Sequence, residues 1–158
     1  MRGDGTRFET LIKDYLTREP SYKDLYTKVQ SYKECAEEHK DLASNKRDIG
    51  VDLVATNADD GAFTAIQCKF YAPGAVVNKS DIDSYIAASD AAHFTRRIIA
   101  ATNEKWGENV KTELKNLTPP VMLLTSDDLS NSRIDCLLHN KNVGSGMRTI
   151  FWTYAANP

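Results

Sequence analysis

The sequence predicts an α/β fold in which a mixed β-sheet is flanked by α-helices. Helical and strand-like patterns follow one another along the 158 residues in the order α, α, β, β, α, β, α, β, α, β. Two strand-like runs joined by a short polar turn indicate a hairpin, and hence an antiparallel pair. Two later runs, 96–101 and 121–124, are apolar on both faces and enclose a helical pattern, which suggests a right-handed crossover between parallel strands. A chain of this length is expected to form one domain.

Two helices are expected before the first strand. The first begins with a capping-box pattern from Thr6 to Glu9, and its apolar residues continue at helical spacing until Pro20 ends it. Glu9 would then reach back to the backbone at the start of the helix. The second helix starts at Ser21 and fades near His39. Its apolar stripe is formed by Leu25, Val29, Tyr32 and Ala36.

The hairpin, residues 48–71, carries polar residues where a strand would prefer apolar ones. Alternate side chains of a strand share a face, so Gln67 and Lys69 lie together. A two-residue turn would place Asp52 opposite Lys69, a four-residue turn opposite Gln67, and a three-residue turn opposite Cys68. In the first two registers an acid, an amide and an amine converge on one face. The other face is expected to take Val51, Leu53 and Ala55.

This convergence has a chemical use and a plainer alternative. Hydrolysis of a phosphodiester uses a hard cation held by oxygen ligands, which the Asp52 carboxylate and either the Gln67 amide or the Cys68 carbonyl can supply. Lys69 would then contact the scissile phosphate or steady the attacking hydroxide. In the alternative, Asp52 and Lys69 form an exposed ion pair across the strands, worth under about 1 kcal/mol. The spacing alone leaves both open.

Helices and strands alternate after the hairpin. A third helix opens at Ser80–Asp83, and its buried side is formed by Ile82, Tyr85, Ile86 and Ser89. The helix between the two apolar runs ends at Pro119, and its stripe is formed by Trp106, Val110, Leu114 and Leu117. An acidic loop at 127–128 follows the second run. A last helix is expected from Ser132, and a β-rich segment at 148–154.

Composition bounds the partners and the compartment. The formal charge of -2 argues against a protein that coats nucleic acid by electrostatics alone. Local basic faces are still compatible with DNA, and the candidates to line a groove are Lys46, Arg47, Lys79, Arg96, Arg97, Lys111 and Lys115. Three widely spaced cysteines indicate a reducing, cytoplasmic compartment, and the histidines lack zinc-ligand spacing. Neither an apolar signal segment nor a run of membrane-spanning length is found, so no membrane partner is expected.

The motif Gly50-Val51-Asp52-Leu53, followed by Gln67-Cys68-Lys69, resembles the PD-(D/E)xK nuclease core in its Gln-x-Lys form. That form is typical of Mrr-like restriction endonucleases, and similar domains open the single-polypeptide, ATP-dependent type ISP restriction-modification enzymes. The resemblance implies a restriction-endonuclease-like sandwich and a Mg²⁺-dependent DNA endonuclease, with Mn²⁺ as a possible substitute, that leaves a 5′-phosphate.

Site roles follow from the same resemblance, residue by residue. Asp52 becomes the metal-binding acid, Gln67 the replacement for the second acidic ligand, and Lys69 the catalytic lysine. Mrr-like nucleases often bring an acid from their first helix to the metal, which makes Glu9 a further candidate ligand. Asp48 is another candidate, because a neutral amide binds Mg²⁺ more weakly than a carboxylate does.

The resemblance also bears on the parent protein. It implies that residues 1–158 are one nuclease domain at the N-terminus of a larger polypeptide with helicase or translocase and methyltransferase domains, and that a second nuclease copy is needed for double-strand cleavage. The alternative from another class is a catalytically inactive nuclease-fold module for DNA binding or assembly. A thiol enzyme would need a base near Cys68, which the sequence lacks; Cys68 is expected to pack on the face opposite Gln67 and Lys69.

Overall fold

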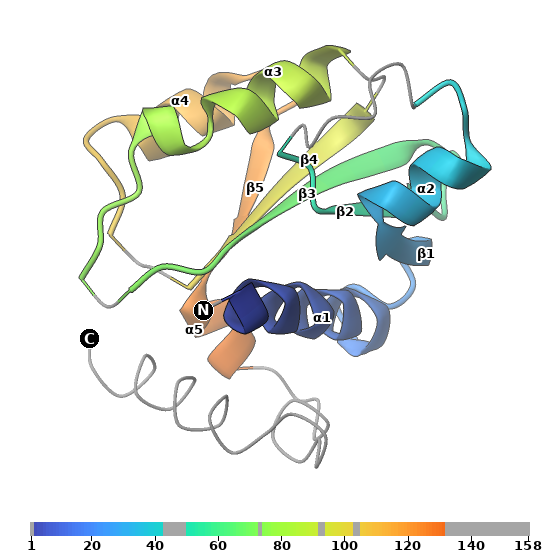
Figure 1. Cartoon of the computed structure of the whole chain (residues 1–158), viewed down its shortest axis with the longest axis horizontal. Coiled ribbons are helices and arrows are strands. Elements are labelled where there is room, and N and C mark those ends of the chain that lie inside the picture. The colour runs from blue at the N-terminus through green and yellow to red at the C-terminus, as the bar shows by residue number, and fades with distance from the viewer. Residues whose placement is uncertain (1, 43–49, 73, 92–93, 103–104, 132–158) are drawn as a thin grey trace.

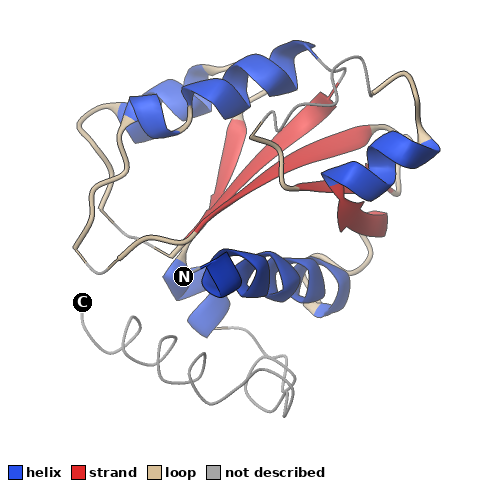
Figure 2. Ribbon diagram, in the orientation of Figure 1, coloured by secondary structure: helices blue, strands red, loops and turns tan. Residues whose placement is uncertain are grey.

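A five-stranded mixed sheet forms the centre of the computed structural model, which describes residues 2–42, 50–72, 74–91, 94–102 and 105–131 (Figures 1 and 2). The strands are β1 (Tyr26–Ser31), β2 (Leu53–Asn57), β3 (Phe63–Lys69), β4 (Phe94–Ala101) and β5 (Val121–Leu124), and they lie side by side in that order. The pairs β1/β2 and β2/β3 are antiparallel, whereas β3, β4 and β5 run parallel. The predicted mixed sheet, with its strand–helix–strand crossover from β4 to β5, is confirmed.

Helices cover both faces of this sheet. They are α1 (Arg2–Arg18), α2 (Tyr32–Glu38), α3 (Asp83–Ala91), α4 (Val110–Asn116) and α5 (Ser126–Ser130), with a short 3-10 turn, η1 (Lys79–Asp81), before α3. Figure 1 shows α1 and α5 beneath one face and α3 and α4 above the other. Successive strand residues point to opposite faces, so Ile98 joins the apolar cluster under α1 and Ile99 the cluster under α3 and α4. None of the described helices is long and apolar enough to cross a membrane.

The start of the first helix differs from the prediction. Helix α1 begins at Arg2, so Thr6 and Glu9 lie inside it, and the predicted capping box is wrong. Within the helix, Thr6 instead accepts a hydrogen bond at its carbonyl from the Thr10 hydroxyl. The end of the helix is as predicted, since α1 stops at Arg18. Glu9 therefore has no capping role.

The predicted second helix is two elements. Residues 26–31 form β1, which pairs with β2, and only the following segment is helical. The helix start is marked by Ser31 and Glu34: the Ser31 hydroxyl accepts the Glu34 N–H at 3.2 Å, and the Glu34 carboxylate accepts the Ser31 N–H at 2.9 Å. Tyr, Thr and Val favour strands, and pairing with β2 adds a tertiary contribution that local spacing does not reveal.

Helix α4 is shorter than predicted and excludes Trp106. Asn109 adopts a left-handed backbone conformation, φ 67°, and the helix begins after it at Val110. Trp106 lies before this break and forms an isolated parallel bridge with Val77.

Two other helix starts also differ. The third predicted helix begins through η1, where the Asp81 carboxylate accepts the Asn78 N–H at 2.8 Å, rather than with a cap at Ser80. The acidic segment after β5 is part of α5, not a loop, and the Asp128 carboxylate accepts the Thr125 N–H at 2.8 Å. The expected elements at 132–158 lie outside the described residues, as do Asp48, Lys46 and Arg47.

Candidate active site

The register of the β2–β3 hairpin decides which polar side chains meet. Leu53 pairs with Ile66, and the Asn57 N–H donates to the Ala62 carbonyl at 2.8 Å, which encloses the four-residue turn 58–61. This is the four-residue alternative of the sequence prediction. The Asp52 N–H donates to the Ile66 carbonyl at 2.9 Å, so the pairing continues past the end of β2 and brings Asp52 to the level of Gln67.

The first strand is shorter than predicted, because β2 begins at Leu53 and not at Asp48. Gly50 has φ 78°, outside the range of an extended strand. As a result the alternation fails before β2. Val51 joins the apolar cluster under α3, whereas Leu53 and Ala55 join the cluster under α1, so the prediction of one shared face for the three is wrong.

Asp52 lies where β2 and β3 separate. Its carboxylate accepts the Cys68 N–H at 2.7 Å, a bond that orients the acid against β3. The N–H and C=O of a strand residue point to the same side, so the Cys68 carbonyl faces the same space as the Asp52 carboxylate. Among the ion pairs between described residues, none joins Asp52 to Lys69. The alternative of a cross-strand ion pair is therefore not formed.

Gln67 is buried, with 2% of its surface exposed. Its side-chain amide lies near Gly50: a Cβ at Gly50 would be 3.5 Å from Gln67 Nε2. Gln67 Oε1 is buried and has no hydrogen-bond partner within the described part of the chain. A buried amide oxygen without a donor, directly across from a carboxylate, is a suitable ligand pair for a hard cation.

Lys69 and Cys68 lie on opposite faces at the end of β3. Lys69 alternates with Gln67 and is half-buried, while Cys68 packs against the apolar cluster under α1, as predicted. Burial raises the pKa of the Cys68 thiol well above its ordinary value, and the negative charges of Asp52 and Glu9 raise it further. Because a thiol nucleophile needs a lowered pKa, Cys68 is unsuited to that role.

Glu9 lies on the middle of α1, half-buried, and its charge acts on the same thiol as that of Asp52. The structure thus brings Glu9 towards the site from the opposite layer. The described residues contain no group of three His, Cys, Asp or Glu side chains arranged to hold a metal. The oxygen set here differs, since it combines carboxylates with the Gln67 amide and the Cys68 carbonyl.

Most of the basic residues proposed for a groove have other partners. Arg97 is 2% exposed, donates to Ser89 Oγ and to the Pro119 carbonyl, and forms an ion pair with Asp90. It is a core residue and does not line a groove. Arg96 pairs with Asp59 at 2.5 Å, and Lys79 with Glu113 at 3.8 Å.

Three contributors to this region are absent from the sequence prediction. The Cys68 N–H is a backbone group, so no residue type announces it. Gly50 stands in the motif, yet its contact with the Gln67 amide depends on the fold. Lys105 follows β4 in a connection without periodicity, and only its neighbour Trp106 could have drawn attention to it.

Together, the mixed sheet and the polar groups at the open end of the β2–β3 hairpin define a nuclease domain. A family model described as restriction endonuclease, of the Mrr catalytic type, matches residues 17–142, and this chain belongs to that family. It is a restriction endonuclease domain, a DNA-cleaving hydrolase module, and the Mrr-like resemblance and fold class predicted from the motif are confirmed.

Solved structures agree with this assignment. The chain is similar to the ATP-dependent type ISP restriction-modification enzyme LlaBIII, bound to DNA in that structure, with a TM-score of 0.70 and 32% identity over 90% of this chain. It spans 9% of the length of LlaBIII. The modification-dependent restriction endonuclease AspBHI matches with a TM-score of 0.43 and 16% identity over 99% of this chain and 41% of that one, too low to carry an argument. No curated protein matches the chain.

Proposed function

We propose that this chain hydrolyses DNA phosphodiester bonds with a divalent cation, Mg²⁺ or Mn²⁺, held by Asp52 and Gln67. The observation that carries the proposal is the buried Gln67 Oε1, which lacks a donor among the described residues and lies across from the Asp52 carboxylate. The Cys68 carbonyl faces the same space, and the Glu9 carboxylate approaches from α1. Such a cation would supply an activated hydroxide and neutralise charge on the scissile phosphate.

The protein groups have separate roles in this proposal. The hydrogen bond from the Cys68 N–H holds the Asp52 carboxylate in one orientation, so the ligand is positioned before the cation binds. The Lys69 ammonium, at the end of β3, donates to the scissile phosphate or to the attacking hydroxide and stabilises the negative charge that develops there. Cleavage would leave a 5′-phosphate, as the motif implies.

The setting of the domain is also a proposal. Residues 1–158 would be one nuclease domain of a larger cytoplasmic enzyme, because LlaBIII, to which the chain is similar, is an ATP-dependent type ISP restriction-modification enzyme. Helicase or translocase and methyltransferase domains would then act on the same DNA, and a second nuclease copy would cut the other strand.

The test is nicking of supercoiled plasmid with Mg²⁺, with Mn²⁺ and with EDTA. Asp52→Asn keeps an acceptor for the Cys68 N–H but removes the charge, and Lys69→Gln removes the ammonium. Each is expected to lower the metal-dependent rate by about 10²-fold or more, the usual effect of removing one transition-state stabiliser. Lys23→Gln, an exposed lysine in the turn before β1, is the matched control.

Metal binding is measured in the same proteins. A cation that binds the folded chain raises its melting temperature by mass action, and Asp52→Asn should abolish the rise. Equal cleavage by all variants would contradict the site. Folded wild-type protein that neither cleaves nor responds to either metal would identify the inactive-module alternative.

A further inference from the structure

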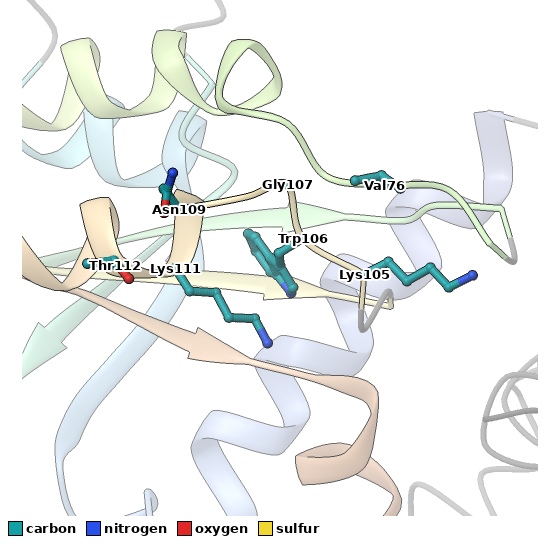
Figure 3. Close-up of a pocket in the computed structure, with 7 residues that line it drawn as sticks. All are labelled: Val76, Lys105, Trp106, Gly107, Asn109, Lys111 and Thr112. Carbon is teal, nitrogen blue, oxygen red and sulfur yellow. The ribbon is translucent and has the colours of Figure 1, made fainter.

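A pocket of about 550 Å³ lies between two connections of the fold, the one that follows β3 and the one that follows β4 (Figure 3). Val76 contributes from the first connection, and Lys105, Trp106 and Asn109 from the second, while Lys111 comes from the first turn of α4. The volume is within the range of sites that hold a small ligand or one nucleotide.

Backbone hydrogen bonds fix the walls of this pocket. The Val77 N–H donates to the Lys105 carbonyl at 2.9 Å, and the Gly107 N–H donates to the Val77 carbonyl at 2.8 Å. A Cβ at Gly107 would lie 3.2 Å from Asn78 Oδ1 and 3.3 Å from the Val77 carbonyl, so the close approach depends on glycine. The two connections are therefore held together, and the pocket is built by the fold.

The pocket opens at the same edge of the sheet as the proposed active site. Lys69 pairs with Ala101 at the ends of β3 and β4, and the Thr102 N–H donates to the Lys69 carbonyl at 3.1 Å. Both connections leave the sheet from this edge, where the carboxyl ends of the parallel strands meet and where α/β proteins commonly bind ligands. A strand of DNA with its scissile phosphate at Lys69 would run past the pocket.

The lining of the pocket suits an anion with an apolar part. Two lysines line it, and none of the described lining residues is acidic. Figure 3 shows the Lys111 ammonium and the Trp106 indole nitrogen on the same side of the pocket, with Lys105 extended in another direction. Trp106 Nε1 has no acceptor within the described part of the chain. Val76 adds exposed apolar surface, 45% of its area.

Charge elsewhere on this side is largely neutralised. Lys79 pairs with Glu113, and Arg96 pairs with Asp59. Lys111 forms no ion pair with any described residue. In a chain of net charge -2, a polyanion must be attracted by such a local group of cations.

We propose that this pocket binds one nucleotide of the DNA strand beside the scissile phosphate. Its backbone phosphate contacts Lys111 and Lys105, and its sugar and base lie against Trp106 and Val76. Lysine binds phosphate as a point charge, and an aromatic ring offers a base a stacking surface without sequence preference. The inference rests on the proposed function in one respect, that the substrate is DNA.

The test is binding of a labelled DNA oligonucleotide in EDTA, where cleavage does not proceed, by fluorescence anisotropy at several salt concentrations. Each phosphate contact contributes about 0.9 to the slope of log Kobs against log salt. Lys111→Gln and Lys105→Gln are each expected to reduce that slope by about 1. The matched control is Lys115→Gln, on the same helix but outside the pocket, which should leave the slope unchanged.

A second readout follows Trp106 itself. The chain has two tryptophans, so Trp152→Phe leaves Trp106 as the single indole fluorophore. DNA should quench its emission, and Lys111→Gln should shift the quenching to higher DNA concentrations.

Three results would overturn the proposal: equal slopes for Lys111→Gln and Lys115→Gln, absence of quenching, or no DNA binding by the unmodified chain at about 10⁻⁴ M, the weak end of non-specific binding. The outcome is separate from that of the active-site experiment. An Asp52→Asn variant that has lost cleavage but keeps the wild-type slope leaves the pocket intact. Pocket variants with wild-type slopes in an active enzyme refute the pocket alone.

Discussion

Gln67 differs from the other buried polar residues around it in the sheet. The Thr64 hydroxyl is bonded to Asn57, and the Arg97 guanidinium to Ser89, Pro119 and Asp90, so each is satisfied by the protein. Gln67 is equally buried, but its Oε1 has no donor among the described residues. Burial of an unsatisfied polar atom costs about 1–3 kcal/mol. A ligand for that oxygen would offset this cost, which is why the proposed cation belongs here.

Gly50 is the residue that lets the Gln67 amide pack as it does. Its φ is 78°, and a Cβ would lie 3.2 Å from Ser84 Oγ and 3.3 Å from the Tyr85 nitrogen, with Gln67 Nε2 at 3.5 Å. We expect Gly50→Ala to lower the free energy of unfolding by about 1–2 kcal/mol from the left-handed backbone alone. Crowding against α3 should add to this loss, and displacement of the amide should reduce metal-dependent nicking. Urea unfolding and the plasmid assay measure the two effects.

Gly61→Ala and Gly74→Ala are matched controls for this prediction. Both glycines have positive φ, 69° and 81°, but a Cβ at either would meet nothing within 4 Å. These variants should show the backbone cost and leave nicking unchanged. If all three variants lose the same stability and the same activity, crowding at Gly50 is not what positions Gln67.

At the scale of elements, strands buried on both faces were the most predictable. The runs that became β4 and β5 are continuous and apolar, as parallel strands between two helix layers must be. The motif likewise indicated Asp52 and Gln67 as neighbours, although three turn lengths were open. The choice among them is made by the bond between Asn57 and Ala62 across the turn, which no residue pattern specifies.

Elements held by distant contacts were less predictable. In β1 and α2 the apolar spacing from Leu25 to Ala36 fits one helix, and only pairing with β2 makes the first half a strand. Trp106 fits the stripe of α4, but the left-handed Asn109 breaks the helix before it. The Lys105–Trp106–Lys111 pocket was missed because its walls come from two connections joined by backbone hydrogen bonds.

The contact between α1 and α5 predicts how stability depends on alkaline pH. Tyr15 is buried, and its hydroxyl donates to the Asp128 carbonyl at 3.5 Å. Burial, together with the charges of Tyr22, Glu19 and Asp128, raises the pKa of Tyr15 from 10.0 to about 12. Because the folded pKa lies above the unfolded one, the neutral phenol contributes stability fully below pH 10, and this contribution is lost as pH rises towards 12.

Tyr15→Phe should therefore weaken the alkaline decline of the unfolding free energy between pH 10 and pH 12. Urea unfolding of both proteins across this range gives the comparison. Below pH 10 the difference between them should be constant, which is the internal control, and other groups that ionise cancel because both proteins carry them. Parallel curves up to pH 12 would show that this phenol ionises as freely in the folded chain as in the unfolded one.

At the scale of the whole molecule, the described surfaces are unequal. Helices cover both faces of the sheet, while Asp52, Gln67, Lys69 and the pocket beside Trp106 all lie at one edge of it (Figure 1). DNA therefore has one edge on which it can meet the site and a local group of cations together. This arrangement explains how a chain of net charge -2 can act on a polyanion.

One edge with one site also limits what one chain can cut. Asp52, Gln67 and Lys69 come from a single hairpin, so each chain is expected to hydrolyse one strand at a time. Nicked plasmid should form at a rate proportional to protein concentration, whereas linear plasmid should form later and with a steeper dependence, because two chains must act on opposite strands. Quantifying the three plasmid forms on gels over a series of protein concentrations measures both orders.

Mixing active chain with an excess of Lys69→Gln protein separates the two steps further. If two chains meet on the DNA, the inactive partner should occupy the second position, so linearisation slows more than nicking does. If linear product instead appears without a nicked intermediate at the lowest protein concentrations, one chain cuts both strands. The hairpin would then have to turn over the duplex between cuts, or a stable pair of chains would have to form before DNA binds. Sedimentation of the free protein distinguishes these, because a stable pair has twice the mass of the chain.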